Sequence, residues 1–388
     1  MNKLNILHLL TFPLYGSGSG TYARYLAEKT GKKHNVAILC PDNRQIPNTE
    51  VITFKMPFKV TFTSHPEWKN CKKFTELTPD QILDLHITYM RAAIKAVKYF
   101  KPNIIHVHHV FPFSWAARFI KSTYNIPYIT TVHGSELPTA QVDKRYVALT
   151  TDALRKSRRV VPNSFYTRDW LFKIFTDDYR SQIRMVPGGV DIKKFHKVKT
   201  TEIDKKYDLK GKKIILFTGK LTKYKGVEFL VKAAQKIKGE VFILGDGPER
   251  KGLEKIAKER EIKNIRFLGH LGENMGELIQ FYSRADVFVA PSIWDEPLGL
   301  VILEAMACET PVVVTRKGGI PLAVKDGKNG LFVRSRNATD IVEKVNRLLD
   351  NDQMRMKMGE QAKETIHKNF TWSLIAEKFN KYYEQFAV

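Results

Sequence analysis

The sequence predicts an α/β protein with two consecutive domains, each built on a parallel sheet that helices cover on both faces. Short apolar runs alternate with amphipathic segments, and this alternation starts afresh near residue 212. A chain of 388 residues with 43% hydrophobic content is also long enough to bury two cores. We therefore expect two Rossmann-like domains, with the Lys-rich stretch 191–212 as the linker.

The first half contains the strands and helices expected of one such domain. Helices are expected at 21–33, 81–100 and 150–157, whereas 41–80 is the least regular part. Six apolar runs that end in Gly, Pro, His or Ser are expected to be strands: 5–10, 35–40, 103–109, 127–133, 158–164 and 183–189.

The second half repeats the pattern with six further expected strands, each followed by a helix candidate: 212–220, 240–248, 264–270, 285–292, 310–316 and 330–335. Open parallel sheets bind ligands beyond the carboxyl ends of their strands. We therefore expect the functional residues directly after the strands, around a cleft between the two domains.

Composition excludes several classes of protein. No apolar run approaches the ~20 residues of a membrane span, and the N-terminus lacks the pattern of a signal peptide. Three widely spaced cysteines suit a reducing compartment, so a cytoplasmic protein is expected. The net charge of +24 lies mostly in the first 200 residues. It suggests an anionic partner, namely a phosphorylated substrate, an acidic membrane or nucleic acid, with a solvated lysine-rich surface as the alternative.

Two turns rich in Gly or Lys are candidate phosphate sites. GSGSG (16–20) follows the first strand and could bring backbone N–H groups to a phosphate, although a flexible turn explains it equally well. GKLTKYKG (219–226) places Lys220 and Lys225 before a helix start, which is a good diphosphate site. Solvation at the surface is the alternative for each lysine.

Three other strand ends carry polar residues. Gly245 and Asp246 lie in a tight turn that could approach a ligand, although Asp246 could instead cap the next helix. His133 ends the strand 127–133 and is a candidate site residue or a core histidine. In the strand 103–109, alternation sends His109 to the face opposite His106 and His108, so these three are expected to be structural or to line the cleft. We expect no metal site.

Two glutamates lie close together in DEPLGLVILEAMA (295–307). Glu296 precedes Pro297 at an expected helix start, where a carboxylate could simply stabilise the helix dipole. Glu304 lies among apolar helical neighbours. A buried carboxylate needs a partner, and a ligand diol such as a ribose could supply one.

The order of these motifs resembles a known family. EPLGLVILE (296–304), with TVHG, VPNSFYTRDWL, VPGGVDIKKF, GKLTKYKG and GDGPE, is similar to the retaining glycosyltransferases of family 4, which have the two-domain GT-B fold. The resemblance implies that Glu296 contacts hydroxyls of the transferred sugar and that Glu304 binds the nucleotide ribose. The familiar Asn-Gly-Val-Asp before the linker is Gly188-Gly189-Val190-Asp191 here.

The resemblance also assigns the remaining site residues. It implies a catalytic set of His133, Glu296 and Lys225, and a donor-binding set of Gly18, Lys220, Lys225, Gly245, Asp246, His270, Glu296, Gly299, Leu300 and Glu304. Lys220 stands where the family usually has arginine. A lysine lacks the planar fork of arginine, so its grip on the diphosphate differs.

It further implies an acceptor-binding domain over 1–195 and a donor-binding domain over 196–369. The last helix, with 370–388, returns to the first domain, and Trp372, Ile375, Phe379 and Tyr383 repeat with the period of a packing face.

The expected function is transfer of a sugar from a UDP- or GDP-sugar to a hydroxyl of an acceptor sugar, lipid or small molecule, with retention and without a metal or cofactor. Synthesis of glycolipid, polysaccharide or cell-envelope glycan is the expected setting. The alternatives are a peripheral membrane enzyme that acts on a lipid acceptor at the inner face of the membrane, or a phosphorylase or epimerase on the same fold. Without a recognised nucleic-acid module, nucleic acid is not an expected partner.

Overall fold

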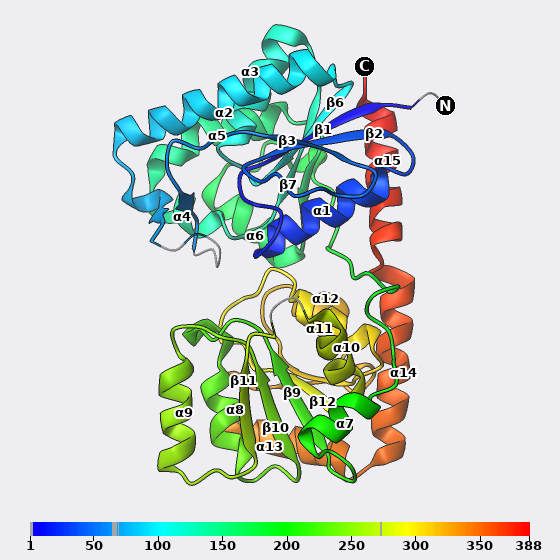
Figure 1. Cartoon of the computed structure of the whole chain (residues 1–388). Coiled ribbons are helices and arrows are strands. Elements are labelled where there is room, and N and C mark those ends of the chain that lie inside the picture. Colours follow the sequence, from blue (N-terminus) through cyan, green and yellow to red (C-terminus); the bar gives the residue numbers. More distant parts are fainter. Residues whose placement is uncertain (1–2, 64–67, 69, 272–273) are drawn as a thin grey trace. The chain divides into compact units, whose positions relative to one another are not determined.

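The computed structural model describes residues 3–63, 68, 70–271 and 274–388. The chain forms two compact units (Figure 1). Unit 1 comprises Met1–Gly188 together with Trp372–Val388, and unit 2 comprises Gly189–Thr371. The sequence places the corresponding limits at residues 195 and 370.

Unit 1 contains a six-stranded parallel sheet in the order β3-β2-β1-β6-β7-β8. Its sixth member is β3, which the sequence does not predict. The strand predicted at 183–189 is wrong, because Ile183 makes only an isolated bridge to Val160. The strands are β1 (Asn5–Leu10), β2 (Asn35–Cys40), β3 (Glu50–Thr53), β6 (Ile104–His108), β7 (Tyr128–Val132) and β8 (Val160–Pro162), while β4 (Val60–Thr61) and β5 (Lys72–Lys73) form a small separate sheet.

Helices cover both faces of this sheet. In Figure 1, α2 and α3 lie along one face, and α1 and α15 lie on the other. The helices of unit 1 are α1 (Gly18–Thr30), α2 (Pro79–Phe100), α3 (Phe113–Tyr124), α4 (Leu137–Val142), α5 (Val147–Lys156), α6 (Phe165–Ile174) and α15 (Trp372–Phe386), with 3-10 turns η1 (Phe74–Glu76), η2 (Lys144–Tyr146) and η3 (Arg180–Gln182).

The last helix, α15, packs on unit 1, as predicted. Trp372 stacks on Tyr25 of α1 with ring centroids 5.5 Å apart, and Tyr22 meets the same indole edge-on at 5.1 Å. Ile375, Phe379 and Tyr383 are fully buried in the same cluster. These residues recur every three or four positions, so one stripe of α15 completes the core.

Unit 2 contains a second six-stranded parallel sheet, in the order β11-β10-β9-β12-β13-β14, and each strand lies within a predicted range. The strands are β9 (Ile214–Thr218), β10 (Glu240–Leu244), β11 (Ile265–Gly269), β12 (Val287–Ala290), β13 (Val312–Thr315) and β14 (Gly330–Val333). The helices are α7 (Thr201–Tyr207), α8 (Val227–Ala234), α9 (Arg250–Glu259), α10 (Met275–Arg284), α11 (Leu300–Ala307), α12 (Ile320–Ala323), α13 (Ala338–Leu349) and α14 (Asp352–Asn369), and Lys223–Lys225 form the 3-10 turn η4.

The sheet of unit 2 reverses its strand order between β9 and β12, and that of unit 1 between β1 and β6. In unit 2, β12 pairs with β9 at two positions, Val287 with Ile215 and Phe288 with Leu216. Because β9 and β12 pair only over this short stretch, the loops at their carboxyl ends can lie apart. Open α/β sheets bind ligands between such loops.

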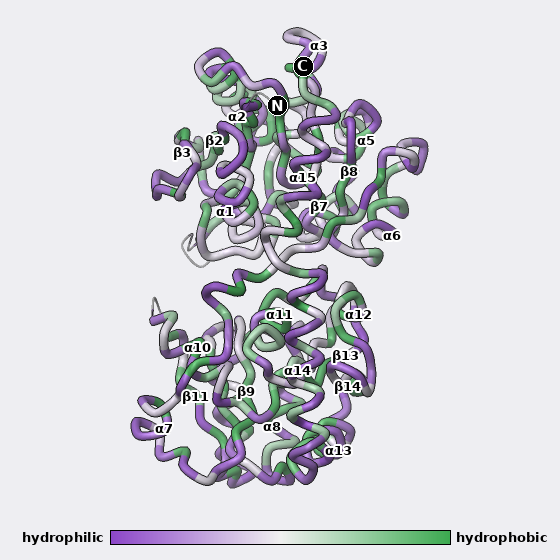
Figure 2. The backbone as a smooth tube through the Cα atoms, turned by 90° about the vertical axis from the view of Figure 1, so that its right-hand side faces the viewer, coloured by the Kyte–Doolittle hydropathy of each residue, from purple (hydrophilic) through white to green (hydrophobic). Residues whose placement is uncertain are grey.

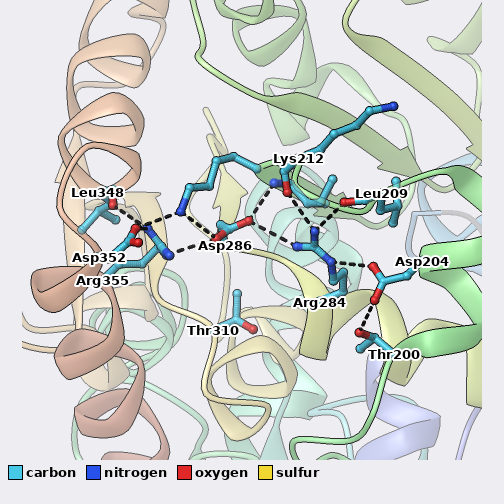
Figure 3. A network of polar contacts seen from close by, with 12 residues as sticks. Thr200, Asp204, Leu209, Lys212, Arg284, Asp286, Thr310, Leu348, Asp352 and Arg355 are labelled. Atoms are coloured by element: carbon cyan, nitrogen blue, oxygen red, sulfur yellow. Dashed lines mark hydrogen bonds and ion pairs between the residues drawn. The ribbon is translucent and has the colours of Figure 1, made fainter.

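A polar network fixes the opposite end of β9 and β12 (Figure 3). Asp286 accepts a hydrogen bond from the backbone N–H of Ile214 at 2.9 Å. Its carboxylate also lies 3.2 Å from Nε of Arg355 on α14 and 3.4 Å from Nη1 of Arg284. Arg284 in turn contacts Asp204 of α7 at 2.7 Å. The network thus ties three helices, α7, α10 and α14, to the start of the strand pair.

Apolar residues concentrate in the sheets and in α11, whose tube is largely green in Figure 2. Despite this, none of the helices in the described ranges combines the length and the apolarity that a membrane span requires.

Candidate functional site

The loops after β9 and β12 meet through an ion pair in unit 2. Nζ of Lys225 lies 2.8 Å from Oε1 of Glu296, and Ser292 donates a hydrogen bond to the same oxygen. Gly226, with φ of 63°, allows this approach, because a Cβ there would lie 2.1 Å from the carbonyl oxygen of Pro291. The two residues predicted to be catalytic in unit 2 are therefore in direct contact.

Glu296 is 9% exposed and is held in the charged form. Burial raises the pKa of this carboxyl, but Lys225 and Ser292 outweigh burial and keep the pKa below its ordinary value. The backbone is fixed as well, since the carbonyl of Glu296 accepts from the N–H of Gly319. A rigid carboxylate at a strand end can accept hydrogen bonds from ligand hydroxyl groups.

The helix expected to start beside Glu296 begins later than predicted. Pro297 lies in the loop, and α11 starts at Leu300 with Gly299 as its N-cap. The φ of 79° at Gly299 is left-handed, so the helix cannot extend back through it. Glu296 therefore lies outside the first turn, and stabilisation of the helix dipole does not explain it. Gly299 and Leu300 do lie at the helix N-terminus, where backbone N–H groups can approach an anion.

Glu304 has a partner within the protein, which the sequence did not reveal. Its Oε2 accepts from the hydroxyl of Tyr282 at 2.9 Å, and that hydroxyl lies 2.7 Å from Oγ1 of Thr218 at the end of β9. Burial raises the pKa of Glu304 to about 7, and the tyrosine bond only partly offsets this. A carboxyl with this pKa is divided between its charged and neutral forms near neutral pH.

The GDGPE turn has a structural reason for its glycines. At Gly245 the φ is 150° and a Cβ would lie 1.9 Å from the carbonyl oxygen of Gly219. The turn therefore packs on the segment that carries Lys220, which is exposed beyond β9. Asp246 does not cap α9, whose N-cap is Glu249. Instead it accepts from the N–H of Gly247 at 2.7 Å and pairs with Arg250.

His270 lies just beyond β11 and is exposed. It is close enough to Asp246 to contribute, after Gly247 and Arg250, to the lowered pKa of that carboxyl. Lys220, Asp246 and His270 thus mark the ends of three adjacent strands, β9, β10 and β11.

In unit 1 the structure places Gly18 at the first position of α1. Its N-cap is Ser17, whose hydroxyl accepts from the N–H of Gly20 at 3.0 Å. A Cβ built at Gly18 meets nothing within 4 Å, so packing does not require a glycine there. A free helix N-terminus of this kind can receive a phosphate.

His133 follows β7 and is 6% exposed. The carboxylate of Glu136 accepts from the backbone N–H of His133 at 3.0 Å, and Nδ2 of Asn163 donates to its carbonyl at 3.0 Å. Burial lowers the pKa of His133 to about 3, so the ring is neutral. The backbone is therefore fixed and the imidazole is available as a neutral hydrogen-bonding group.

His133 belongs to a larger group of buried histidines at the β1/β6 switch point. His8, His106 and His108 present ring nitrogens within 4.8 Å of one another and could hold a metal ion. Except for Nε2 of His8, the ring nitrogens of these three residues already have protein partners among the described residues. His106 contacts Tyr383 and Thr131 at 2.7 Å each, and His8 contacts His108 at 3.0 Å. His109 lies beyond the end of β6 with φ of 75°, and its ring packs on Phe12 and Phe62, whereas the ring of His106 packs on Phe379 in the other core cluster of unit 1.

Comparison with known proteins shows to which family a chain with these two candidate sites belongs. The family model described as Glycosyl transferases group 1 matches residues 199–365, and that described as Glycosyltransferase Family 4 matches residues 16–194. The chain belongs to this glycosyltransferase family. It is 28% identical to an uncharacterized glycosyltransferase of Methanocaldococcus jannaschii, over 74% of this chain and 76% of the relative.

Two further relatives have different names. Spore coat protein SA of Bacillus subtilis is 28% identical over 70% of this chain and 76% of its own length. The D-inositol 3-phosphate glycosyltransferase of Corynebacterium jeikeium is 35% identical, over 52% of each chain.

Solved structures show the fold of this glycosyltransferase. Sucrose-phosphate synthase of Thermosynechococcus elongatus matches with a TM-score of 0.80, 21% identity and 99% coverage of both chains. Anabaena HepE in complex with UDP matches with a TM-score of 0.79 and 16% identity, over 98% of this chain and all of that one. The predicted GT-B fold is confirmed.

Sequence reasoning missed four polar residues around the candidate sites of this glycosyltransferase. Ser292 and Tyr282 bind the two glutamates, Glu136 binds the backbone of His133, and His8 contacts His108, which in turn contacts His133. His8 carries a signal that could have been used, because a histidine inside an apolar strand needs a partner. Tyr282 and Ser292 carry none, because each looks like an ordinary helix or loop residue.

Proposed function

We propose that this glycosyltransferase moves a hexosyl group from a nucleoside-diphosphate sugar to an acceptor hydroxyl, with retention at the anomeric carbon and without a metal ion. The observation that carries the proposal is the contact between Lys225 and Glu296 at the switch point of unit 2. It places a cation and a carboxylate side by side beyond the strand ends, as the diphosphate and the sugar hydroxyls of one donor require.

The chemistry assigns a separate task to each group. The leaving diphosphate gains negative charge in the transition state, so a fixed cation stabilises that state more than the ground state. Lys225, with Lys220 and the N–H groups at Gly299 and Leu300, supplies positive charge. Glu296 orients the sugar by accepting from its hydroxyl groups.

Glu304 would bind the nucleoside. Its second carboxylate oxygen, together with the one bound by Tyr282, can accept from a ribose diol. Structures of Anabaena HepE with UDP and with UDP-glucose support a uridine nucleotide as the first donor to test. For unit 1, the family resemblance assigns Gly18 to the donor diphosphate and His133 to the donor sugar.

No group in this set is an obvious covalent nucleophile, so we assign the acceptor proton to the leaving phosphate on the same face of the sugar. Thermal-shift measurements with UDP, GDP, ADP and their sugars test donor binding, since a ligand of the native state raises the melting temperature. Product analysis by NMR then reports the anomeric configuration. Turnover with free phosphate and without nucleotide would instead indicate a phosphorylase.

A lipid acceptor is the second candidate, and the positive charge concentrated in the first 200 residues favours it. Docking on anionic vesicles should weaken as salt rises. Sedimentation with phosphatidylglycerol vesicles at low and high salt tests this, and equal binding to neutral vesicles would argue against it.

A further inference from the structure

Three buried histidines of unit 1 form a continuous hydrogen-bonded chain. Nδ1 of His8 lies 3.0 Å from Nε2 of His108, and Nδ1 of His108 lies 3.2 Å from Nε2 of His133. The rings of His8 and His108, and those of His108 and His133, are stacked with centroids 5.3 Å and 5.4 Å apart. The chain runs from the β1/β6 switch point to the end of β7.

Each link in this chain uses one proton. Burial drives the pKa of His8 and of His133 down to about 3, and it holds the pKa of His108 well below its ordinary value. All three rings are therefore neutral, and each carries one N–H and one bare nitrogen. In every link one histidine must donate and the other accept, so the whole chain has a single direction.

The far end of the chain decides that direction. Nε2 of His8 is fully buried and has no hydrogen-bond partner among the described residues. A buried N–H without an acceptor is rarer than a buried acceptor without a donor. The proton of His8 therefore lies on Nδ1 and is donated to His108. His108 then carries its proton on Nδ1 and donates it to Nε2 of His133.

We propose that His108, and His8 behind it, are positioning residues that hold His133 in the neutral tautomer with its proton on Nδ1. The hydrogen bond at one imidazole nitrogen selects the state of the other. His133 then offers Nδ1–H as a fixed neutral donor. Its role toward an oxygen of the donor sugar rests on the proposed function, whereas the tautomer itself does not.

Matched variants of His108 separate the two links. An asparagine amide can replace Nδ1 of the imidazole, so His108→Asn keeps a donor toward His133. A glutamine amide reaches the position of Nε2, so His108→Gln keeps the contact with His8 and loses that with His133. His106→Gln is the control, because His106 is equally buried on the same strand but bonds Tyr383 and Thr131 instead.

The test is long-range proton–nitrogen NMR of the full chain labelled with ¹⁵N-histidine at pH 7. We expect Nδ1–H signals for His8, His108 and His133, preserved at His133 in His108→Asn and in His106→Gln and lost in His108→Gln. With the donor found by thermal shift, His108→Gln should lower kcat about tenfold or more with unchanged KM for the donor, and His108→Asn should restore most of it.

Three results would overturn the proposal. They are a proton on Nε2 of His133, one equivalent of zinc or another transition metal in the purified protein by elemental analysis, or wild-type kcat in His108→Gln. If the wild-type chain transfers no sugar while its spectra show the expected tautomers, the proposed function fails and the tautomer assignment stands.

Discussion

Lys225 and Glu296 are 71 residues apart in the chain and 2.8 Å apart in the structure. Each residue determines the state of the other, because Lys225 keeps the buried carboxylate charged and the carboxylate holds the ammonium between the two loops. A diphosphate that binds Lys225 must therefore either displace Glu296 from the ammonium group or bind it alongside Glu296.

Replacing Lys225 by Met should weaken UDP binding at least tenfold and reduce transfer by two orders of magnitude or more, because it removes a cation that acts on the leaving group. Calorimetric titration and initial rates measure the two effects. Lys223→Met is the matched control, since Lys223 is exposed in the same 3-10 turn and should behave as wild type. Near-full activity of the Lys225 variant would remove this lysine from the catalytic set.

Glu304 predicts a pH dependence of stability. Its pKa is about 7 in the folded chain and 4.5 when unperturbed, so the folded state binds more protons between these values. Stability therefore falls as pH rises through this window, by up to about 2–3 kcal/mol from this group. Glu304→Gln should be more stable than wild type at pH 8 and similar at pH 4.5 by calorimetry. Glu309→Gln, at a carboxyl just beyond the end of α11, should not show this crossover.

The same titration should govern nucleotide binding. A ribose diol donates to a charged carboxylate, so affinity for UDP should rise as pH increases from 6 to 8. In Glu304→Gln this part of the pH dependence should disappear, leaving only the titration of UDP itself. Identical pH profiles for the two proteins would argue against Glu304 as the ribose ligand.

Gly245→Ala should disrupt the loops of unit 2, because its Cβ would lie 1.9 Å from the backbone of Gly219 and φ is 150°. We expect a loss of about 1–3 kcal/mol and weaker UDP binding, because the segment with Lys220 must shift. Gly252→Ala is the control, with open space in α9. It should be neutral or stabilise by up to about 1 kcal/mol. Equal melting temperatures for both variants would contradict the packing argument.

Arg284→Met should destabilise unit 2 by about 2–3 kcal/mol, because it removes the partly buried counter-charge of Asp204 and one of the counter-charges of Asp286, and also the donor to two backbone carbonyls. Lys238→Met is the comparison, because its pair with Asp350 is more than half exposed on both sides and should be worth less than about 1 kcal/mol. Calorimetry that resolves the two units measures both, and a small effect at Arg284 would show that the network contributes little.

Strands were predictable wherever an apolar run was continuous and ended in a turn residue. β3, Glu50–Thr53, escaped because its residues are half-polar and lie at the sheet edge, where one face stays exposed. The run 183–189 failed in the opposite way. Its apolar residues are interrupted by arginine and proline. Pairing with β8 is limited to a bridge at Ile183 and a backbone hydrogen bond from Val186.

The candidate site was predictable in its residues more than in its contacts. Strand ends and the family resemblance indicated Lys225, Glu296 and Glu304, but pairing over many residues depends on the fold, so neither the ion pair nor the bond from Tyr282 could be read from spacing. The helix expected at Pro297 was misplaced because a left-handed Gly299 leaves no local signal that distinguishes it from a helical glycine.

The return of α15 to unit 1 has a consequence for synthesis on the ribosome. Tyr22 and Tyr25 of α1 are among the earliest residues made, yet the side chains that cover them belong to 372–386. Unit 2 is continuous in sequence, and the ribosome synthesises all of it before α15. The nascent chain therefore carries an uncovered aromatic surface through most of translation, and this surface is where a chaperone would be expected to bind.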